Sequence, residues 1–436
     1  GTIAQSVSRY KEKIDKVLTE IKLDSRVSRK KKKKKPVADF IEEVSHVCGQ
    51  VIRTSTEHRQ VAGDSVEGVR LDIAIKKEAG PLIGHVELKS PSKSANPIKK
   101  AGWSKHDKAQ WKKLAHHPNL LYCNGLEMSL MRQGSERPLI HLELDATKTS
   151  AAADAQVEAV KELFTQFLSW SPIVPSKPKD LAQQLAPLTA FLRDAVLDVL
   201  SEVTEGNGLP VLYKNWSVNL MPGATHKEFA DSFAQTFTYA LLLARIESDL
   251  DSEQFGVGAI NNSLRQNGHK LIASVLELMG QDTYRKAVDG PITLLETTIG
   301  AVDKNQFAQS IDPWLYFYED FLAAYDPKMR KDAGVYYTPV EIVDLQVRLL
   351  DDILKTRFGR QKGLGADDVN ILDPAVGTGA YPLAVASHVL ADSDAPQIDA
   401  HSLGSRLYGF ELLMGSYSVA HLRLTQALEQ YSANLD

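Results

Sequence analysis

Three side chains in the first third of the chain have the types and spacing needed to cut a phosphodiester. Asp72 lies near the end of one alternating segment, and Glu87 and Lys89 lie on the next. Because side chains alternate along a strand, Glu87 and Lys89 share a face. Two carboxylates can hold a hard divalent cation that activates water, and a lysine can stabilise the developing charge. The same residues also occur on ordinary exposed strands, so the pattern alone leaves both interpretations open.

A second candidate site is the segment DPAVGTGAY, residues 373–381. An apolar run ends at Asp373, which predicts a buried strand, a tight turn at Gly377 and Gly379, and a helix from about Ala380. The first N–H groups of that helix point at the crevice beyond the strand. The next strand ends in YGFE, so Glu411 lies beside the crevice and can accept hydrogen bonds from a ribose. The pattern predicts a nucleoside-containing ligand.

The elements that must position the first site are predicted by periodicity. Residues 1–24 and the segment after Pro36 have helical spacing. The run RKKKKKKP between them, residues 29–36, is expected to be a solvated arm, with a specific phosphate-contacting role as the alternative. The segments VRLDIAI and GHVELKS alternate with period two around KKEAGP, which predicts a β-hairpin. A basic helix (KKAGWSKHDKAQWKKLA) and two short strands (NLLYCNG, MSLMRQG) follow. Residues 37–148 therefore form one α/β domain, preceded by an N-terminal helix and arm, 1–36.

The rest of the chain changes character twice. Residues 149–330 are almost wholly helical in pattern, with a Pro-rich joint at 171–180, and we expect a connector domain. Its aromatic residues Trp314, Tyr316, Phe317 and Tyr318 can stack on bases, but their dense spacing favours core packing. Residues 331–436 have the pattern of a strand, a Gly-rich turn, a helix and a second strand. This pattern predicts the first part of a doubly wound parallel sheet. The predicted fold class is α/β plus all-α.

Composition restricts the class of protein. The chain has 436 residues, 43% hydrophobic and 24% charged, and no apolar run long enough to cross a bilayer. Its only cysteines, Cys48 and Cys123, exclude a disulfide framework and fit a cytoplasmic protein. Residues 1–150 contain 29 Lys+Arg and 18 Asp+Glu, a balance of +11, so the remainder carries −15 of the total −4. A basic first third suggests that this part meets a polyanion.

The second site resembles the amino-methyltransferases that act on adenine in DNA, because GVYYTP, residues 334–339, precedes DPAVGTGAY. The resemblance implies a Rossmann-like domain that binds S-adenosylmethionine. Tyr337, Thr338 and Pro339 would lie at the methionine carboxylate, and Glu411 would bind the ribose. The methionine half would be framed by Asp373, Ala375, Gly377 and Gly379. Tyr381 departs mildly from the family, which prefers Phe at that place.

The first site, together with HPNLLYCNGLEMSL, resembles the PD-(D/E)xK nuclease domain of type I and type IIG restriction enzymes. The resemblance implies that Asp72, Glu87 and Lys89 are catalytic and that Asp72 and Glu87 bind Mg²⁺. It also implies supporting roles for Gln110 and for Glu43, with Glu42 as the alternative to Glu43.

Together the two resemblances are to a type IIG-like restriction-modification enzyme. This implies a Mg²⁺-dependent endonuclease joined to an S-adenosylmethionine-dependent adenine-N6 methyltransferase, both acting on double-stranded DNA. The resemblance implies an Asn/Asp-Pro-Pro-Tyr/Phe loop that holds the extruded adenine, but the chain contains no Pro-Pro dipeptide and so lacks this loop. We therefore expect a protein truncated at its carboxyl end and no methyl transfer by this chain alone. The absence of a Gly-x4-Gly-Lys-Ser/Thr loop argues against an ATP-driven motor.

Two other interpretations stay open. One is a phage-defence methyltransferase whose nuclease-like module only binds DNA. The other is a non-catalytic DNA-binding subunit that serves in assembly.

Overall fold

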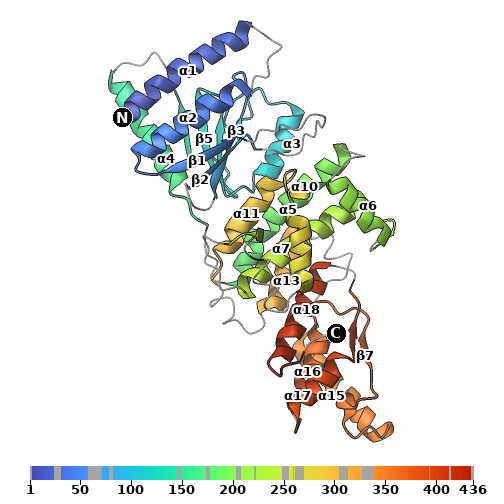
Figure 1. Ribbon diagram of the computed structural model, residues 1–436. Coiled ribbons are helices and arrows are strands. Elements are labelled where there is room, and N and C mark those ends of the chain that lie inside the picture. Colours follow the sequence, from blue (N-terminus) through green and yellow to red (C-terminus); the bar gives the residue numbers. More distant parts are fainter. Residues whose placement is uncertain are drawn as a thin grey trace. The chain divides into compact units, whose positions relative to one another are not determined.

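The computed structural model divides the chain into two compact units (Figure 1). The first contains residues 1–173, 194–211 and 285–301, and the second contains the remaining segments. The structure describes residues 2–23, 31–56, 71–77, 82–144, 150–172, 177–202, 208–219, 222–247, 255–258, 260, 270–303, 313–326, 338–391, 393–411 and 414–433.

The first unit is built on a six-stranded sheet with the strands in chain order. The strands are β1 (Ile52–Thr56), β2 (Ile73–Lys77), β3 (Leu82–Leu88), β4 (Asn119–Cys123), β5 (Glu127–Arg132) and β6 (Ile140–Glu143). Neighbours are antiparallel except β3 and β4, which are parallel. The predicted hairpin is confirmed as β2 and β3, with Ile73 opposite Val86. Asp72 lies just before β2 rather than within it.

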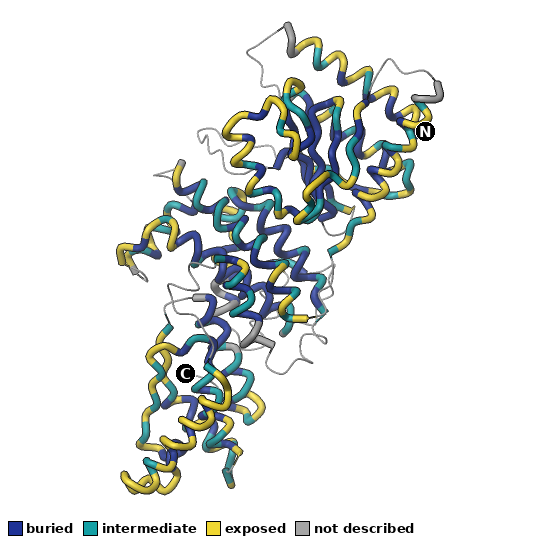
Figure 2. The backbone as a smooth tube through the Cα atoms, turned by 180° about the vertical axis from the view of Figure 1, so that it is seen from behind, coloured by how far each residue is buried: buried dark blue, intermediate teal, exposed yellow. Residues whose placement is uncertain are grey.

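Helices cover both faces of this sheet. Helices α1 (Ile3–Leu23), α2 (Lys31–Val47) and α4 (Ser150–Leu168) share one hydrophobic core with alternate strand residues such as Ile73, Val86 and Leu88 (Figures 1 and 2). Helix α3 (Lys105–Leu114) lies on the opposite face, where Trp111 packs edge-on against Tyr122 of β4. Helix α4 thus belongs to the core of this unit, although its sequence falls in the predicted connector.

The expectation of a solvated lysine arm is wrong for the described part of the run. Residues Lys31–Lys35 form the first turns of α2, Pro36 lies inside this helix, and Lys33 is fully buried. Lysine has good helix propensity, and a buried ammonium is tolerated when acceptors surround it. The Lys33 ammonium donates to the backbone carbonyls of Lys89 and Asn124. Arg29 and Lys30 lie outside the described residues.

The second unit is helical in its first part. Its core helices include α7 (His226–Glu247), α9 (Lys270–Gly280) and α13 (Pro313–Tyr325). Phe317 and Tyr318 of α13 are buried and pack against Tyr239 of α7, which confirms core packing for these two aromatic residues. The side chains of Trp314 and Tyr316 lie outside the described residues. Four further helices of the chain are α5 (Pro178–Glu202), α6 (Leu209–Asn219), α10 (Asp282–Arg285) and α11 (Asp289–Gly300).

The last part of this unit contains a two-stranded parallel sheet, as the sequence predicts. Strands β7 (Ile371–Asp373) and β8 (Leu407–Gly409) pair with Asp373 opposite Gly409. The surrounding elements are α15 (Val340–Arg357), η1 (Gly363–Gly365), α16 (Ala380–Ala391), α17 (Pro396–Gly404) and α18 (Met414–Glu429). Helix α16 begins at Ala380, the predicted residue. Within the described residues, no helix is long and apolar enough to span a membrane.

Candidate active sites

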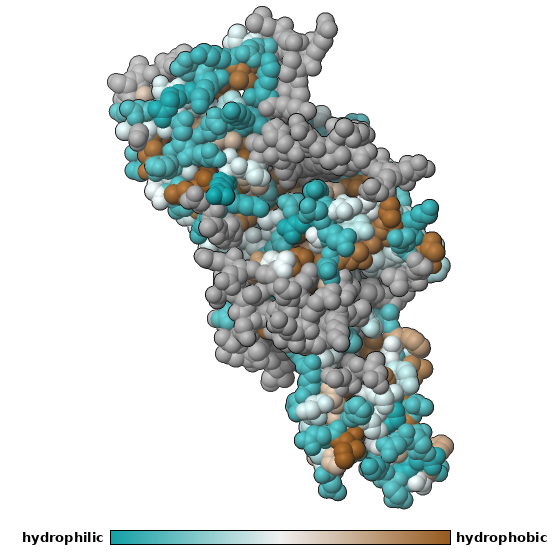
Figure 3. Space-filling model, viewed as in Figure 1, coloured by the Kyte–Doolittle hydropathy of each residue, from teal (hydrophilic) through white to brown (hydrophobic). Residues whose placement is uncertain are grey.

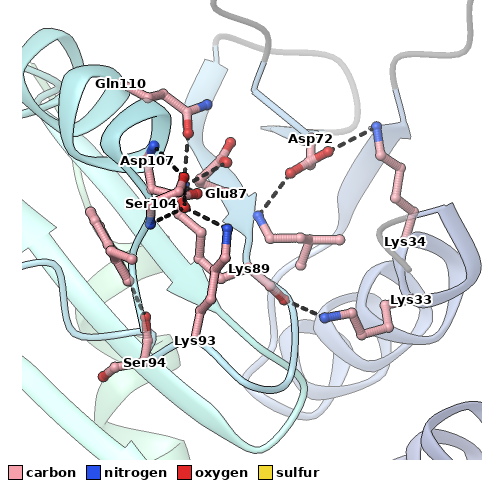
Figure 4. A network of polar contacts seen from close by, with 12 residues as sticks. Lys33, Lys34, Asp72, Glu87, Lys89, Lys93, Ser94, Ser104, Asp107 and Gln110 are labelled. Atoms are coloured by element: carbon pink, nitrogen blue, oxygen red, sulfur yellow. Dashed lines mark hydrogen bonds and ion pairs between the residues drawn. The ribbon is translucent and has the colours of Figure 1, made fainter. Parts of the chain in front are cut away.

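The first candidate site is centred on the ammonium of Lys89, which directly follows β3 (Figure 4). This side chain is fully buried. Its Nζ donates to Gln110 Oε1 at 2.7 Å and lies 3.3 Å from Glu87 Oε1. It also lies 4.9 Å from the ring centroid of Trp103 and 5.5 Å from that of Tyr122. Two oxygen acceptors and two aromatic faces therefore fix one buried cation.

Asp107 completes the shell around Lys89, and spacing alone does not predict it. Its Oδ1 lies 3.3 Å from Lys89 Nζ, and its Oδ2 accepts hydrogen bonds from Ser104 and Lys93. Ser104 and Asp107 form a capping box that begins α3. Burial alone raises the pKa of Asp107, but bonds from Lys93 and Ser104 and the charge of Lys89 outweigh it and hold the pKa well below its usual range. In the sequence, the Ser-x-x-Asp pattern of a capping box is the signal that could have identified Asp107.

Asp72 is fixed beside the same strand. Its Oδ2 accepts the backbone N–H of Leu88 at 2.9 Å, and its own N–H donates to Val86 O at 3.1 Å. The ammonium of Lys34 in α2 lies 3.1 Å from Asp72 Oδ1 (Figure 4). Lys34 is a second member of the site that spacing in the strands does not indicate, because it comes from the lysine run.

The structure joins Gln110 to the predicted trio but gives Glu43 other partners. Glu43 accepts two hydrogen bonds from Arg9 of α1, at 3.0 and 2.9 Å. Glu43 follows Lys34 by nine residues in α2, which is about 13.5 Å along the helix axis at a rise of about 1.5 Å per residue. It therefore lies more than two turns from the residue of this helix that contacts Asp72. Glu42, the alternative, accepts the backbone N–H of Thr54 in β1 at 3.0 Å. The supporting roles of Gln110 and Glu43 remain predictions, and Gln110 is the one that contacts Lys89.

A divalent cation fits the donor types at this site. Among the described residues, no group of three or more His, Cys, Asp or Glu side chains is arranged to hold a metal ion. Mg²⁺, however, is commonly held by one or two carboxylates, with water and substrate phosphate completing its shell. Asp72 and Glu87 are two carboxylates at adjoining strand ends. In this structure Asp72 pairs with Lys34 and Glu87 pairs with Lys89. Their oxygens are suited to a hard cation.

The second candidate site lies at the carboxyl ends of β7 and β8. The backbone N–H of Phe410 donates to Asp373 O at 3.0 Å, and that of Val376 to Phe410 O at 2.9 Å. The turn from Val376 to α16 contains Gly377, with φ 56°, and Gly379, with φ 87°, a backbone conformation that favours glycine. The Glu411 carboxylate accepts the N–H of Gly377 at 2.9 Å.

The hydrogen-bonding groups of this turn suit a polar cofactor such as S-adenosylmethionine. Asp373 Oδ1 accepts the N–H of Ala375 at 3.1 Å, whereas Asp373 Oδ2 is buried and has no hydrogen-bond partner among the described residues. Buried polar atoms usually have a hydrogen-bond partner, so this oxygen is available to accept a hydrogen bond from a ligand. Thr338 and Pro339 lie directly before α15, and Tyr337 lies outside the described residues.

The chain matches one family model, over the region that carries this second site. Residues 310–427 match the N-6 DNA methylase family. This methylase region contains Thr338, Pro339 and all the glycines and acids of the β7–β8 turn. No curated protein matches the chain significantly.

Several solved structures of larger proteins align with the chain. The chain of a DrdV–DNA complex is 17% identical with a TM-score of 0.39, over 99% of this chain and 39% of that one. The ATP-dependent type ISP restriction-modification enzyme LlaBIII, bound to DNA, is 19% identical with a TM-score of 0.40, over 67% and 19%. The type IIG restriction endonuclease BpuSI is 12% identical with a TM-score of 0.30, over 92% and 40%. The chain thus spans less than half the length of each.

Proposed function

We propose that the chain carries the nuclease, and the cofactor-binding part of the methyltransferase, of a restriction-modification enzyme. The first unit would be a Mg²⁺-dependent endonuclease, and the methylase region would bind S-adenosylmethionine for adenine-N6 methylation of double-stranded DNA. The observation that carries the nuclease half is the buried Lys89 ammonium held by Glu87 and Gln110 beside the fixed carboxylate of Asp72. An isolated Glu–Lys pair on an exposed strand would have no such shell.

In the nuclease half each residue has a distinct task. Asp72 and Glu87 would hold the cation, which when bound supplies Lewis-acid activation of water and of the phosphate. Lys89 would stabilise negative charge on the phosphate or orient the attacking water. Gln110 and Asp107 keep its ammonium in one position, so that little reorganisation is needed when DNA binds.

In the methylase region the chain's own groups would hold the cofactor. Glu411 would give up its hydrogen bond from Gly377 and accept hydrogen bonds from the ribose hydroxyls instead. Asp373 Oδ2 would accept a hydrogen bond from the methionine half of the cofactor. Thr338 and the adjacent backbone would bind the carboxylate. The sequence has no Pro-Pro dipeptide, so cofactor binding rather than methyl transfer is the informative readout.

Plasmid cleavage tests the nuclease half. The whole chain should nick or cut plasmid DNA with Mg²⁺, and Asp72→Asn and Lys89→Met should each lose about a hundredfold or more in rate. Lys77→Met is the charge-matched control for Lys89, because Lys77 is exposed at the end of β2. If these two variants bind DNA and cut like the control, the endonuclease proposal is wrong. DNA binding without cleavage by the unmodified chain would favour a DNA-binding module instead.

Calorimetric titration tests the cofactor half. S-adenosylmethionine should bind the chain, and Asp373→Ala should weaken binding about tenfold or more. Asp368→Ala is the control, because Asp368 is exposed and pairs with Arg360. Equal affinities for the two variants would contradict the assigned cofactor site.

A further inference from the structure

Successive lysines of α2 have different partners. Lys32 pairs with Glu20 at 2.8 Å, and Lys33 is buried against the backbone carbonyls that follow β3 and β4. Lys34 forms an ion pair with Asp72, and Lys35 is exposed. The run is therefore part of the candidate nuclease site, and Lys34 is its member in contact with a site carboxylate.

The contact between Lys34 and Asp72 is well defined. Lys33 fixes the start of α2 to the chain beside Lys89, so the helix presents Lys34 from a fixed base. The exposed fractions of the Lys34 and Asp72 side chains are 17% and 8%. An ion pair this sheltered is less screened than one at the open surface.

We propose that Lys34 is a further phosphate-binding residue of the nuclease site, and that it serves as the counter-ion of Asp72 until a divalent cation replaces it. This proposal rests on the proposed nuclease function. The two cations repel each other at short range and cannot both lie against Asp72 Oδ1. Lysine has a flexible four-carbon stem, so its ammonium can move from Asp72 to a nearby DNA phosphate while α2 stays in place.

The test compares Lys34→Gln with Lys35→Gln. Both variants remove one positive charge from the same helix, but Lys35 is exposed. Without DNA, Mg²⁺ titrated calorimetrically should bind Lys34→Gln about threefold to tenfold more tightly than the unmodified chain, because a competing cation is gone. With DNA and saturating Mg²⁺, single-turnover cleavage by Lys34→Gln should be about tenfold slower, because a phosphate contact is gone. Lys35→Gln should show neither change.

The opposite signs of the two effects separate a functional role from a structural one. If Lys34→Gln weakened both Mg²⁺ binding and cleavage, Lys34 would only support the fold, and the proposal would be overturned. It would also be overturned if the two variants behaved alike, or if no form of the chain bound Mg²⁺. Asp72→Asn distinguishes a failure of the underlying function: if this variant cut DNA normally, the nuclease site would lie elsewhere, whatever Lys34 does.

Discussion

Lys33 and Lys89 are both fully buried lysines, and each ammonium is matched in a different way. Carboxylate and amide oxygens surround Lys89, whose proposed role is to stabilise negative charge on a phosphate. Backbone carbonyls surround Lys33, which ties α2 to the ends of β3 and β4. Lys33 therefore has a structural role, and of these two residues the chemical role is proposed for Lys89 alone.

Removing the Lys33 ammonium should destabilise the first unit. Lys33→Met keeps the aliphatic stem but leaves carbonyls of Lys89 and Asn124 without this donor, at a cost of about 2 kcal/mol in the free energy of unfolding. Urea denaturation measures the change. Lys35→Met, at an exposed position of the same helix, should change stability by less than about 0.5 kcal/mol. Equal values for both variants would contradict the assigned role of Lys33.

A buried histidine pair should make stability depend on pH. His85 Nδ1 and His117 Nε2 are 2.9 Å apart, and the N–H of Asn119 donates to His117 Nδ1, so the neutral His117 donates to His85. Burial, and to a smaller degree Lys76, lower the pKa of His85 to about 3. Burial, with His85 and Arg132 nearby, lowers the pKa of His117 well below its usual value. Both side chains are therefore neutral in the folded protein.

In the unfolded chain these histidines have pKa values of about 6.5. Between that value and the folded pKa the unfolded state binds more protons, so stability is lost as pH falls below about 6.5. Each histidine contributes at most about 1.4 kcal/mol per pH unit. Denaturation between about pH 7 and 5 measures the slope, which should be smaller in His85→Gln/His117→Gln than in His116→Gln, where an exposed histidine is changed. Equal slopes would exclude the buried pair as its source.

At the scale of elements, the turn before α16 depends on helix α18. A Cβ added at Gly379 would lie 3.3 Å from Ala420 Cα, whereas one at Gly377 would meet nothing within 4 Å. Both glycines have positive φ, so alanine at either position is strained by about 1–2 kcal/mol. Of the two glycines, only Gly379 also allows the turn to pack closely against α18.

Gly379→Ala should therefore be more harmful than Gly377→Ala. We expect Gly379→Ala to lower the stability of the second unit by about 1 kcal/mol more, because the turn must move away from α18. Its affinity for S-adenosylmethionine should fall more as well. Thermal denaturation and calorimetry of the two variants measure these differences, and the reverse order would contradict the packing assigned to Gly379.

The predictable elements are those that follow from local periodicity. Strict alternation around residues 72–89 predicts β2 and β3, and the apolar run ending at Asp373 predicts β7 and the start of α16. Charge alone does not indicate that Lys31–Lys35 are helical, because the acceptors of Lys33 belong to strand ends far along the chain. Asp107 and Lys34 join the candidate site through contacts of the same tertiary kind. Glu43 satisfies the expected sequence position, yet its carboxylate pairs with α1.

At the scale of the whole molecule, charge is distributed unevenly. Residues 1–150 carry +11 and the remainder −15. The face of the first unit that Figure 3 shows is mostly hydrophilic where it is described. A basic module in an acidic chain should bind a polyanion chiefly through phosphate contacts.

Affinity for DNA should therefore depend strongly on salt. Binding to a short duplex in EDTA should weaken at least about tenfold between about 50 and 200 mM NaCl, because each neutralised phosphate releases counterions. Fluorescence anisotropy measures the dependence. Salt-independent binding would rule out the basic first third as the DNA-binding surface.

The parallel pairing of β3 and β4 also places two partners of Lys89 in one connection. Two consecutive parallel strands need a crossover, and α3 forms part of that crossover. Lys89, Asp107 and Gln110 all belong to it, so their contacts close a short loop at little entropic cost. Lys34 must reach Asp72 across a longer stretch that includes β1. The contacts of Lys89 are therefore local in the sequence, whereas the contact of Lys34 with Asp72 joins separate elements of the first unit.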